Sequence, residues 1–156
     1  PHSRMVLLKD YNDEGFIFYT NYESNKGNDI IKNANVCLNF HWKSLLRQIR
    51  IEGKVEKVSN ETSDKYFNSR HYLSRIGAWA SNQSKVLKSR DDLENKIEFY
   101  KNKFPEKENF PRPDYWGGFI VKYSKIEFWE DMPHRIHKRE VFEFKDNDWV
   151  SYTLSP

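Results

Sequence analysis

The chain has 156 residues, 16% of them aromatic, and its 26 basic and 23 acidic side chains leave a formal charge of +3. This length is typical of a single domain over residues 1–156 that buries a core of its own. A charge so close to balance argues against a general polyanion-binding protein, because such proteins carry a clear basic excess. Any site for an anion must therefore be local.

Cysteine content and hydropathy limit the class of protein further. One cysteine cannot form a disulfide within the chain, and Cys37 stands in the apolar run NVCLNF, where we expect a buried and unreactive thiol. No run approaches the roughly 20 apolar residues that span a bilayer, and no signal peptide is visible. The cytoplasm is therefore the expected compartment.

Strand signals, that is, β-branched and aromatic residues bounded by turn residues, dominate the chain. Residues 10–15 are turn residues that join the first two strands into a hairpin, and residues 145–148 are the turn between the last two. Gly53 interrupts the long fourth strand and indicates a bulge or a close approach of backbone. In chain order the predicted strands are residues 4–9, 16–20, 35–42, 45–58, 117–129, 134–144 and 149–154.

Helices are predicted in the gaps between these strands. Residues 23–35 are typical of a turn that leads into a short helix. Residues 59–70 begin with a candidate serine cap, and residues 89–104 open with Ser89 and acidic side chains and stop before Pro105. Many strands with a few helices in one short chain predict a mainly β (α+β) fold, a closed or partly closed β-barrel with peripheral helices.

Three short stretches collect polar side chains that a core would not favour. Residues 24–26 (SNK) begin a predicted helix, where backbone N–H groups, the helix dipole and Lys26 favour a phosphate. Arg4 and Lys9 flank an apolar run, and residues 81–84 (SNQS) carry amide and hydroxyl groups that suit a heteroaromatic ring or a phosphate ester. The ordinary alternatives are a plain helix cap, solvated cations at strand ends, and a turn.

A fourth stretch, residues 134–140 (HRIHKRE), places Arg135, His137 and Arg139 two apart. On a strand these side chains share one face, and such a row of cations needs an anion or an electron-rich ring opposite it. The alternative is an exposed face whose charge is balanced by the neighbouring acids Glu130, Asp131 and Glu140. The sequence contains no HExxH, phosphate-loop or GxGxxG motif, and no metal site is predicted.

Taken in order, these and other stretches resemble the pyridoxine (pyridoxamine) 5′-phosphate oxidase family, flavoproteins with an FMN-binding split β-barrel. The resemblance runs nearly from end to end, and it is specific because so many motifs occur in one order. Its motifs are RMVLLK, GFIFYTN, SNKG, RQIRIEG, YFNSR, SRIGAWASNQS, WGGF, IEFW, RIHKR and the closing LSP.

The resemblance implies roles for individual residues. Lys26 would hold the FMN phosphate, and Gln48 would bond the isoalloxazine edge. Arg135 and His137 would be catalytic and lie over the pyridine ring of the substrate. The implied cofactor-binding residues are Arg4, Met5, Val6, Leu7, Leu8, Lys9, Tyr19, Thr20, Asn25, Lys26, Gln48, Gln83, Ser84, Trp129 and Arg139. The implied substrate-binding residues are Lys9, Tyr66, Arg70, Ser74, Arg135 and His137, of which Tyr66, Arg70 and Ser74 would clamp the phosphate.

The resemblance also implies the chemistry and the assembly. Pyridoxine 5′-phosphate or pyridoxamine 5′-phosphate would give up a hydride from its C4′ carbon to FMN, yielding pyridoxal 5′-phosphate, and oxygen would be reduced to hydrogen peroxide. The family forms homodimers with two FMN sites at the subunit interface, each built from both chains. Neither a nucleic acid nor a membrane is expected as a partner.

The chain departs from the family pattern at several positions. Asn25 stands where the family usually has arginine, which predicts weaker FMN binding by about 1–3 kcal/mol. Lys138 replaces a usual aspartate, which puts the geometry of the flanking arginines in doubt, and His71 replaces a usual proline. We also expect the N-terminal segment that helps to cover the substrate in the family to be absent from this chain.

Three alternatives remain open at this point. One is a related FMN split-barrel oxidase with another substrate, such as those of phenazine synthesis. Another is a non-catalytic protein that binds flavin or pyridoxal phosphate. The third is a β-barrel that stacks single-stranded nucleic acid on its aromatic side chains, which the near-neutral charge argues against.

Overall fold

A computed structural model describes residues 2–105 and 110–156 of the chain. The strands are β1 (Asp10–Asn12), β2 (Gly15–Asn21), β3 (Asn35–Trp42), β4 (Arg47–Lys57), β5 (Trp116–Glu130), β6 (Lys138–Lys145) and β7 (Asp148–Thr153). The helices are α1 (Asn25–Lys32), α2 (Asn60–Ser69), α3 (Tyr72–Ala80) and α4 (Arg90–Lys103), with single 3₁₀ turns η1 (Lys43–Leu45) and η2 (Pro133–Arg135). The predicted mainly β fold with peripheral helices is confirmed.

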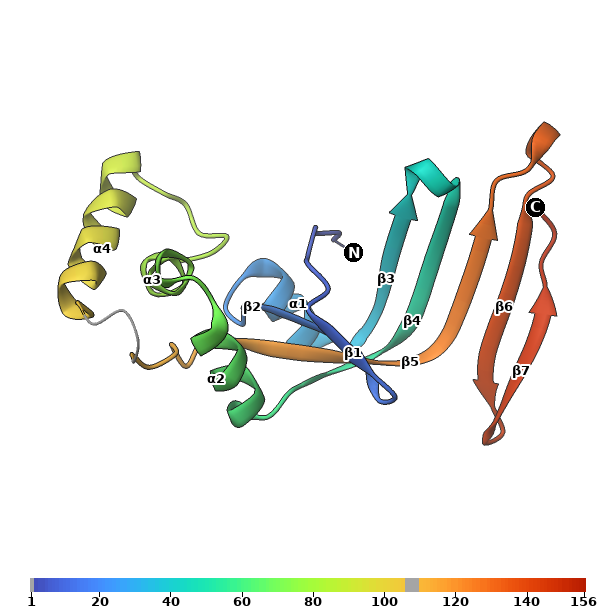
Figure 1. The fold of residues 1–156 in the computed structure, drawn as a ribbon, viewed down its shortest axis with the longest axis horizontal. Helices are drawn as coiled ribbons and strands as arrows, with labels where there is room; N and C mark the ends of the chain where they lie inside the picture. The colour runs from blue at the N-terminus through green and yellow to red at the C-terminus, as the bar shows by residue number, and fades with distance from the viewer. Residues whose placement is uncertain (1, 106–109) are drawn as a thin grey trace.

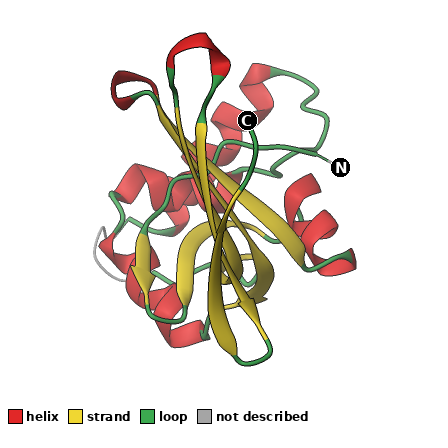
Figure 2. Cartoon of the chain, turned by 90° about the vertical axis from the view of Figure 1, so that its right-hand side faces the viewer, coloured by secondary structure: helices red, strands yellow, loops and turns green. Residues whose placement is uncertain are grey.

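All strand pairs are antiparallel, and the long strand β5 organises the sheet. Its first half, residues 116–121, pairs with β2, and its second half, residues 125–130, pairs with β6, while β4 runs along its other edge. The sheet therefore divides along β5 into one branch that leads to β1 and another that leads to β7 (Figure 1). Seen from the side, the strands cross one another instead of lying flat, as expected for strongly twisted strands (Figure 2).

Gly53 marks an irregularity in the pairing of β4 with β5, as predicted. The register shifts between Glu52 and Gly53. A Cβ atom added at Gly53 would lie 2.1 Å from the carbonyl oxygen of Lys122, so only glycine allows the two backbones to approach this closely. The predicted bulge and the predicted close approach are both confirmed.

The described residues form two separate apolar clusters, one in each part of the molecule. In the sheet, Phe18, Val55, Phe119 and Val121 form a buried group. Beneath the helices, a second group contains Phe67, Ile76, Phe110 and Trp116. Helices α2, α3 and α4 gather at one end of the long axis in Figure 1, and the β6–β7 hairpin lies at the other. No helix in the described ranges is long and apolar enough to cross a membrane.

Several predicted elements agree closely with the structure. Residues 35–42 form β3 with the predicted bounds. The predicted serine caps are confirmed, because Ser59 accepts a hydrogen bond from the Thr62 amide and Ser89 accepts one from the Asp92 amide. Helix α3, which begins after His71, was not predicted, since its sequence lacks a serine, threonine or acidic cap.

Two predicted strands are wrong in whole or in part. Residues 4–9 are not a strand: Met5 is 98% exposed and Leu7 is 70% exposed, and the hairpin strand preceding the turn is β1 instead. Residues 134–144 form a strand only from Lys138 onward, because His134 (φ 59°) and Arg135 (φ 62°) adopt left-handed conformations in the turn that follows Pro133. Strand propensity alone does not provide the hydrogen-bonded neighbour that a strand needs.

The prediction of a buried Cys37 is also wrong. Its thiol is exposed, because β3 lies at one end of the strand order and its side chains alternate between half-buried and exposed positions. Cys37 falls on the exposed face, whereas its neighbours Val36 and Leu38 pack against the core of the sheet.

Candidate functional site

The predicted site residues fall mainly into two cavities of the chain. The first cavity, of about 510 Å³, lies between the N-terminal segment, β2, α2 and α3. Its walls contain the predicted residues Met5, Val6, Leu7, Lys9, Tyr19, Thr20, Lys26, Tyr66, Arg70, Ser74 and Gln83. Segments from four parts of the sequence are thus brought together here.

The first cavity carries positive charge, and its described wall residues include no acid. The charge comes from Lys9, Lys26 and Arg70, which line it. The Lys26 ammonium donates to Thr20 Oγ1 at 2.7 Å and lies 3.5 Å from Gln83 Oε1, both neutral acceptors. Burial, with the nearby Arg4 guanidinium, lowers the pKa of Lys26. The cavity is therefore suited to an anionic ligand.

Lys26 is held in place by the start of helix α1. Ser24 is buried and caps the helix by accepting a hydrogen bond from the Gly27 amide at 3.2 Å. Gly27 allows the helix to lie against the preceding chain, since an added Cβ would be 2.1 Å from the Tyr22 carbonyl oxygen. Asn25 is exposed and does not line the cavity.

Stacked aromatic rings form one wall of the first cavity. The rings of Tyr19 and Tyr66 lie 3.8 Å apart between centroids, and that of Trp116 lies 5.6 Å from Tyr19. The guanidinium of Arg70 lies over the Trp116 ring, with 4.6 Å between its Cζ atom and the ring centroid, a distance at which a cation–π attraction holds it there. Its Nη1 atom is buried and has no hydrogen-bond partner within the described part of the chain. Burial lowers the pKa of Arg70, because removal from water disfavours the charged guanidinium.

The second cavity, of about 720 Å³, lies where β4 begins, β5 ends and β6 begins. It contains the predicted residues Gln48, Trp129, His137 and Arg139. Strand register explains why these residues meet: Gln48 is paired with Trp129, and Trp129 is paired with Arg139. Three side chains that are distant in the sequence thus form one row across the sheet.

Acids lie beside the basic side chains of the second cavity. One of them, Asp131, was suggested by the sequence, and another, Glu127, was not. Arg139 Nε donates to Glu127 Oε1 at 2.7 Å, and Glu127 Oε2 accepts from Arg50 Nη1 at 3.2 Å. His137 Nδ1 lies 2.9 Å from Asp131 Oδ1, as one of the suggested pairings allowed. The hydrogen bond to Arg139 lowers the pKa of Glu127.

The suggested compensation by Glu130 does not involve the cationic row. Glu130 forms an ion pair with Arg47, with 3.2 Å between Nη2 and Oε1, and it is the cross-strand neighbour of Lys138. Lys138 does not leave its neighbour Arg139 without an acid, because Arg139 is paired with Glu127.

Some predicted residues lie outside these two cavities. Arg4 and Leu8 line a third cavity of about 260 Å³ beside β3. Asn25, Ser84 and Arg135 are exposed and line none of the three. Sequence reasoning missed the wall residues Asn21 and Trp116 and the buried Glu127, whereas Ser81 belongs to the polar stretch at residues 81–84 that the sequence indicated. The signal that could have found Glu127 is an acid on the inward face of an apolar strand.

Comparison with known proteins identifies the family. A family model described as pyridoxamine 5′-phosphate oxidase matches residues 1–103, and one described as the pyridoxine 5′-phosphate oxidase C-terminal dimerisation region matches residues 116–156. A pyridoxine/pyridoxamine 5′-phosphate oxidase of Pelagibacter ubique is 52% identical over all of this chain and 76% of its own length. One of Cytophaga hutchinsonii is also 52% identical, over all of this chain and 73% of its length.

Two solved structures have a fold similar to that of this chain. PhzG from Burkholderia lata, crystallised with tetrahydrophenazine-1-carboxylic acid, superposes with a TM-score of 0.92 at 26% identity over 99% of this chain and 75% of that one. A pyridoxamine 5′-phosphate oxidase-related, FMN-binding protein from Nostoc punctiforme shares the fold, with a TM-score of 0.75 at 13% identity over 98% and 80% of the two chains. The predicted split-barrel fold is thereby confirmed. With both halves of the sequence matched and relatives identical at half of all positions, the chain belongs to the pyridoxamine 5′-phosphate oxidase family.

Proposed function

We propose that this chain is an FMN-dependent oxidase that converts pyridoxine 5′-phosphate or pyridoxamine 5′-phosphate to pyridoxal 5′-phosphate, with oxygen reduced to hydrogen peroxide. The observation that carries the proposal is the first cavity, which has Lys9, Lys26 and Arg70 but no acid among its described wall residues. A phosphorylated cofactor and a phosphorylated substrate together supply the anions that these cations lack.

FMN fits the chemistry of the residues present. The Lys26 ammonium has neutral partners only, which leaves its charge available to a phosphate. The cavity volume of about 510 Å³ lies in the usual range for cofactor sites. Lys26, Thr20 and Gln83 would hold FMN on this side, and Gln48, Trp129 and Arg139 would hold it on the other. When bound, FMN supplies the redox chemistry by accepting a hydride and passing the electrons to oxygen.

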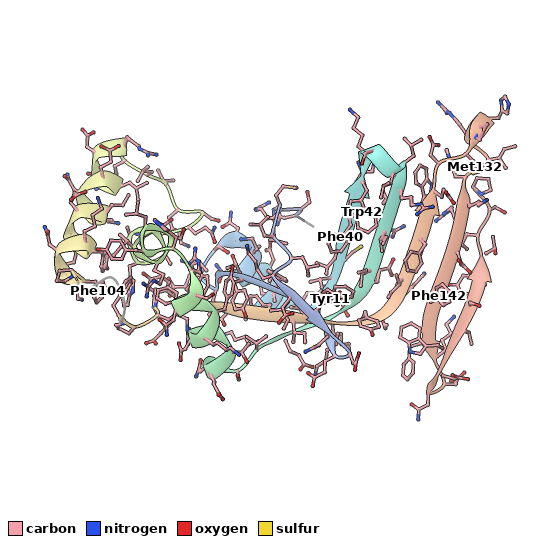
Figure 3. All side chains as sticks on the ribbon, viewed as in Figure 1. Tyr11, Phe40, Trp42, Phe104, Met132 and Phe142 are labelled. Atoms are coloured by element: carbon pink, nitrogen blue, oxygen red, sulfur yellow. The ribbon has the colours of Figure 1, made fainter. Side chains whose placement is uncertain are left out.

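The two sets of residues point to a site shared between two chains. In a single chain the first cavity lies by α2 and α3, whereas the second lies at the far end of the sheet by β6. Figure 3 shows these two ends of the chain: Phe104, which packs against the cluster beneath the helices, lies at one end of the long axis, and Met132, next to the turn before β6, lies at the other. Trp129 and Arg139 of the second cavity lie in the region matched by the dimerisation model, whereas Gln48 lies outside it. We infer a homodimer in which each FMN site joins the first cavity of one chain to the second cavity of its partner.

The chain's own residues would bind and orient the substrate. Arg70, with its unpaired Nη1, would bind the substrate phosphate together with Tyr66 and Ser74. From the partner, Arg135 and His137 would lie over the pyridine ring. His137 Nδ1 lies 2.9 Å from Asp131 Oδ1 and accepts from the Met132 amide at 3.2 Å, and these contacts fix the orientation of the imidazole.

The direct test is a visible spectrum of the purified protein with added FMN, followed by anaerobic addition of pyridoxine 5′-phosphate. We expect the flavin absorbance to bleach and to return when air is admitted, with formation of hydrogen peroxide. Binding of FMN without bleaching would contradict the proposed substrate. A protein that binds no FMN would contradict the whole proposal.

The similarity to PhzG favours one competing function, oxidation of a phenazine precursor. The residues that the family resemblance assigns to the substrate phosphate, Tyr66, Arg70 and Ser74, line one cavity here, which supports the phosphorylated substrate. Bleaching by a tetrahydrophenazine carboxylic acid, without bleaching by pyridoxine 5′-phosphate, would support this alternative.

The lowered pKa of Lys26 predicts a pH dependence of FMN binding. A bound phosphate favours the charged ammonium and raises that pKa again, so affinity is highest where Lys26 is protonated in the free protein. As pH rises through the lowered pKa, affinity is expected to fall, and at a lower pH than for an ordinary lysine. Fluorescence titrations with FMN between about pH 7 and pH 10 measure the effect. The same slope in Lys26→Met, or with riboflavin, which lacks the phosphate, would contradict this origin.

A further inference from the structure

A buried carboxylate lies in the row of the sheet beside the residues that line the second cavity. Glu127 is 5% exposed and occupies the row of the sheet next to Gln48, Trp129 and Arg139, with Arg50 as its neighbour on β4 and Val141 as its neighbour on β6. It lines none of the three cavities and so touches no ligand in them. An acid in such a position needs partners, because an unpaired buried charge strongly destabilises a fold.

Glu127 has two such partners, one on each side. Its Oε1 accepts from Arg139 Nε at 2.7 Å, and its Oε2 accepts from Arg50 Nη1 at 3.2 Å. The chain of charges ends at Glu52, whose Oε1 accepts from Arg50 Nη2 at 3.0 Å. Each oxygen of Glu127 is therefore committed to one arginine, and Arg139 is held through its inner nitrogen.

The C-terminal residues hold the other side of Arg139. Its Nη1 donates to the Ser155 carbonyl oxygen at 3.0 Å, and its own carbonyl accepts from the Leu154 amide at 3.0 Å. With Nε bound to Glu127 and Nη1 to the tail, the guanidinium cannot rotate freely. A donor fixed in advance loses little conformational entropy when it binds a ligand.

We propose that Glu127 is a positioning residue of the flavin site, which acts by holding Arg139 in the orientation that contacts FMN. This inference rests on the proposed function, in which Arg139 is a cofactor-binding residue. The hydrogen bond from Arg139 also lowers the pKa of Glu127 and raises that of Arg139, so both stay charged at neutral pH. Glu127 therefore sets the geometry of Arg139 without competing for the ligand.

The test is a double-mutant cycle read out as the Kd of FMN for the dimeric apoprotein, measured by flavin fluorescence. Glu127→Gln keeps the size of the side chain but removes its charge, and the amide cannot accept from both arginines. We expect Kd to rise about 10- to 100-fold, as for the loss of a charge-assisted hydrogen bond. In an Arg139→Gln background the same change at Glu127 is expected to have almost no effect.

Glu52→Gln is the matched control, because Glu52 belongs to the same chain of charges but contacts Arg50 and not Arg139. Its Kd should equal that of the unaltered protein. If Glu127→Gln does not fold, the pair Arg50→Gln with Glu127→Gln removes the excess positive charge and should show the same weakened binding.

Three results would overturn the inference. An unchanged Kd in folded Glu127→Gln, or an equal loss with and without Arg139, would mean that Glu127 acts on the fold alone. An unchanged Kd of FMN in Arg139→Gln would mean that Arg139 does not contact the flavin. A dimeric, folded wild-type protein that binds no FMN would overturn both this inference and the proposed function.

Discussion

Replacing Arg70 by methionine is expected to lower kcat/KM for pyridoxine 5′-phosphate by about two to three orders of magnitude, chiefly through KM. Arg70 Nη1 is buried without a partner among the described residues, and the guanidinium is held against the Trp116 ring. The substrate phosphate would supply the missing acceptor. Loss of the Arg70 guanidinium therefore removes a charge-assisted contact at a partly buried position. Steady-state kinetics on the FMN-loaded enzyme measure the change.

The same substitution should leave the apoprotein as stable as before, or more stable. Removing a half-buried cation without an anion relieves its desolvation, whereas a structural arginine would leave broken hydrogen bonds behind. Lys65→Met, at an exposed position of α2, changes the net charge equally and serves as the control. Pyridoxine without its phosphate should react equally slowly with Arg70→Met and with the parent protein. A loss of the same size with this substrate would contradict a role in binding phosphate.

When substrate and FMN are both limiting, mixing two impaired variants is expected to restore activity if each site is shared between chains. Arg70→Met damages the first cavity, and Arg139→Gln damages the second. A mixed dimer would contain one site with both defects and one site with neither. Random pairing yields half of the dimers as mixed ones, so activity should return to about a quarter of that of the parent protein.

The control for this experiment pairs two variants with defects in the same cavity. Arg70→Met mixed with Lys26→Met leaves one defect in every site, so no recovery is expected. The mixtures are prepared by coexpression, and the mixed dimer is isolated with two different affinity tags. If the isolated Arg70/Arg139 mixed dimer is as impaired as its parents under the same limiting conditions, the site is not divided between the chains as proposed.

Local chemistry determined several features of this protein from the sequence alone. The bounds of β3, the serine caps at Ser59 and Ser89, and the irregularity at Gly53 all follow from the preferences of a few adjacent residues. The order of motifs along the chain also led to the family and its split-barrel fold, which the comparisons confirm. These features need no knowledge of which distant segments meet.

Other features were decided only by the tertiary structure, because they depend on partners that are remote in the sequence. Residues 4–9 have strand-forming side chains but no full hydrogen-bonded neighbour. The turn after Pro133 replaces the first part of the strand predicted at residues 134–144, so the strand begins only at Lys138 and presents no continuous cationic face. The exposure of Cys37 follows from the place of β3 in the sheet. The pairing of Arg139 with Glu127 follows from the register of β5 with β6, which places their side chains in adjacent rows, so that each satisfies the charge of the other.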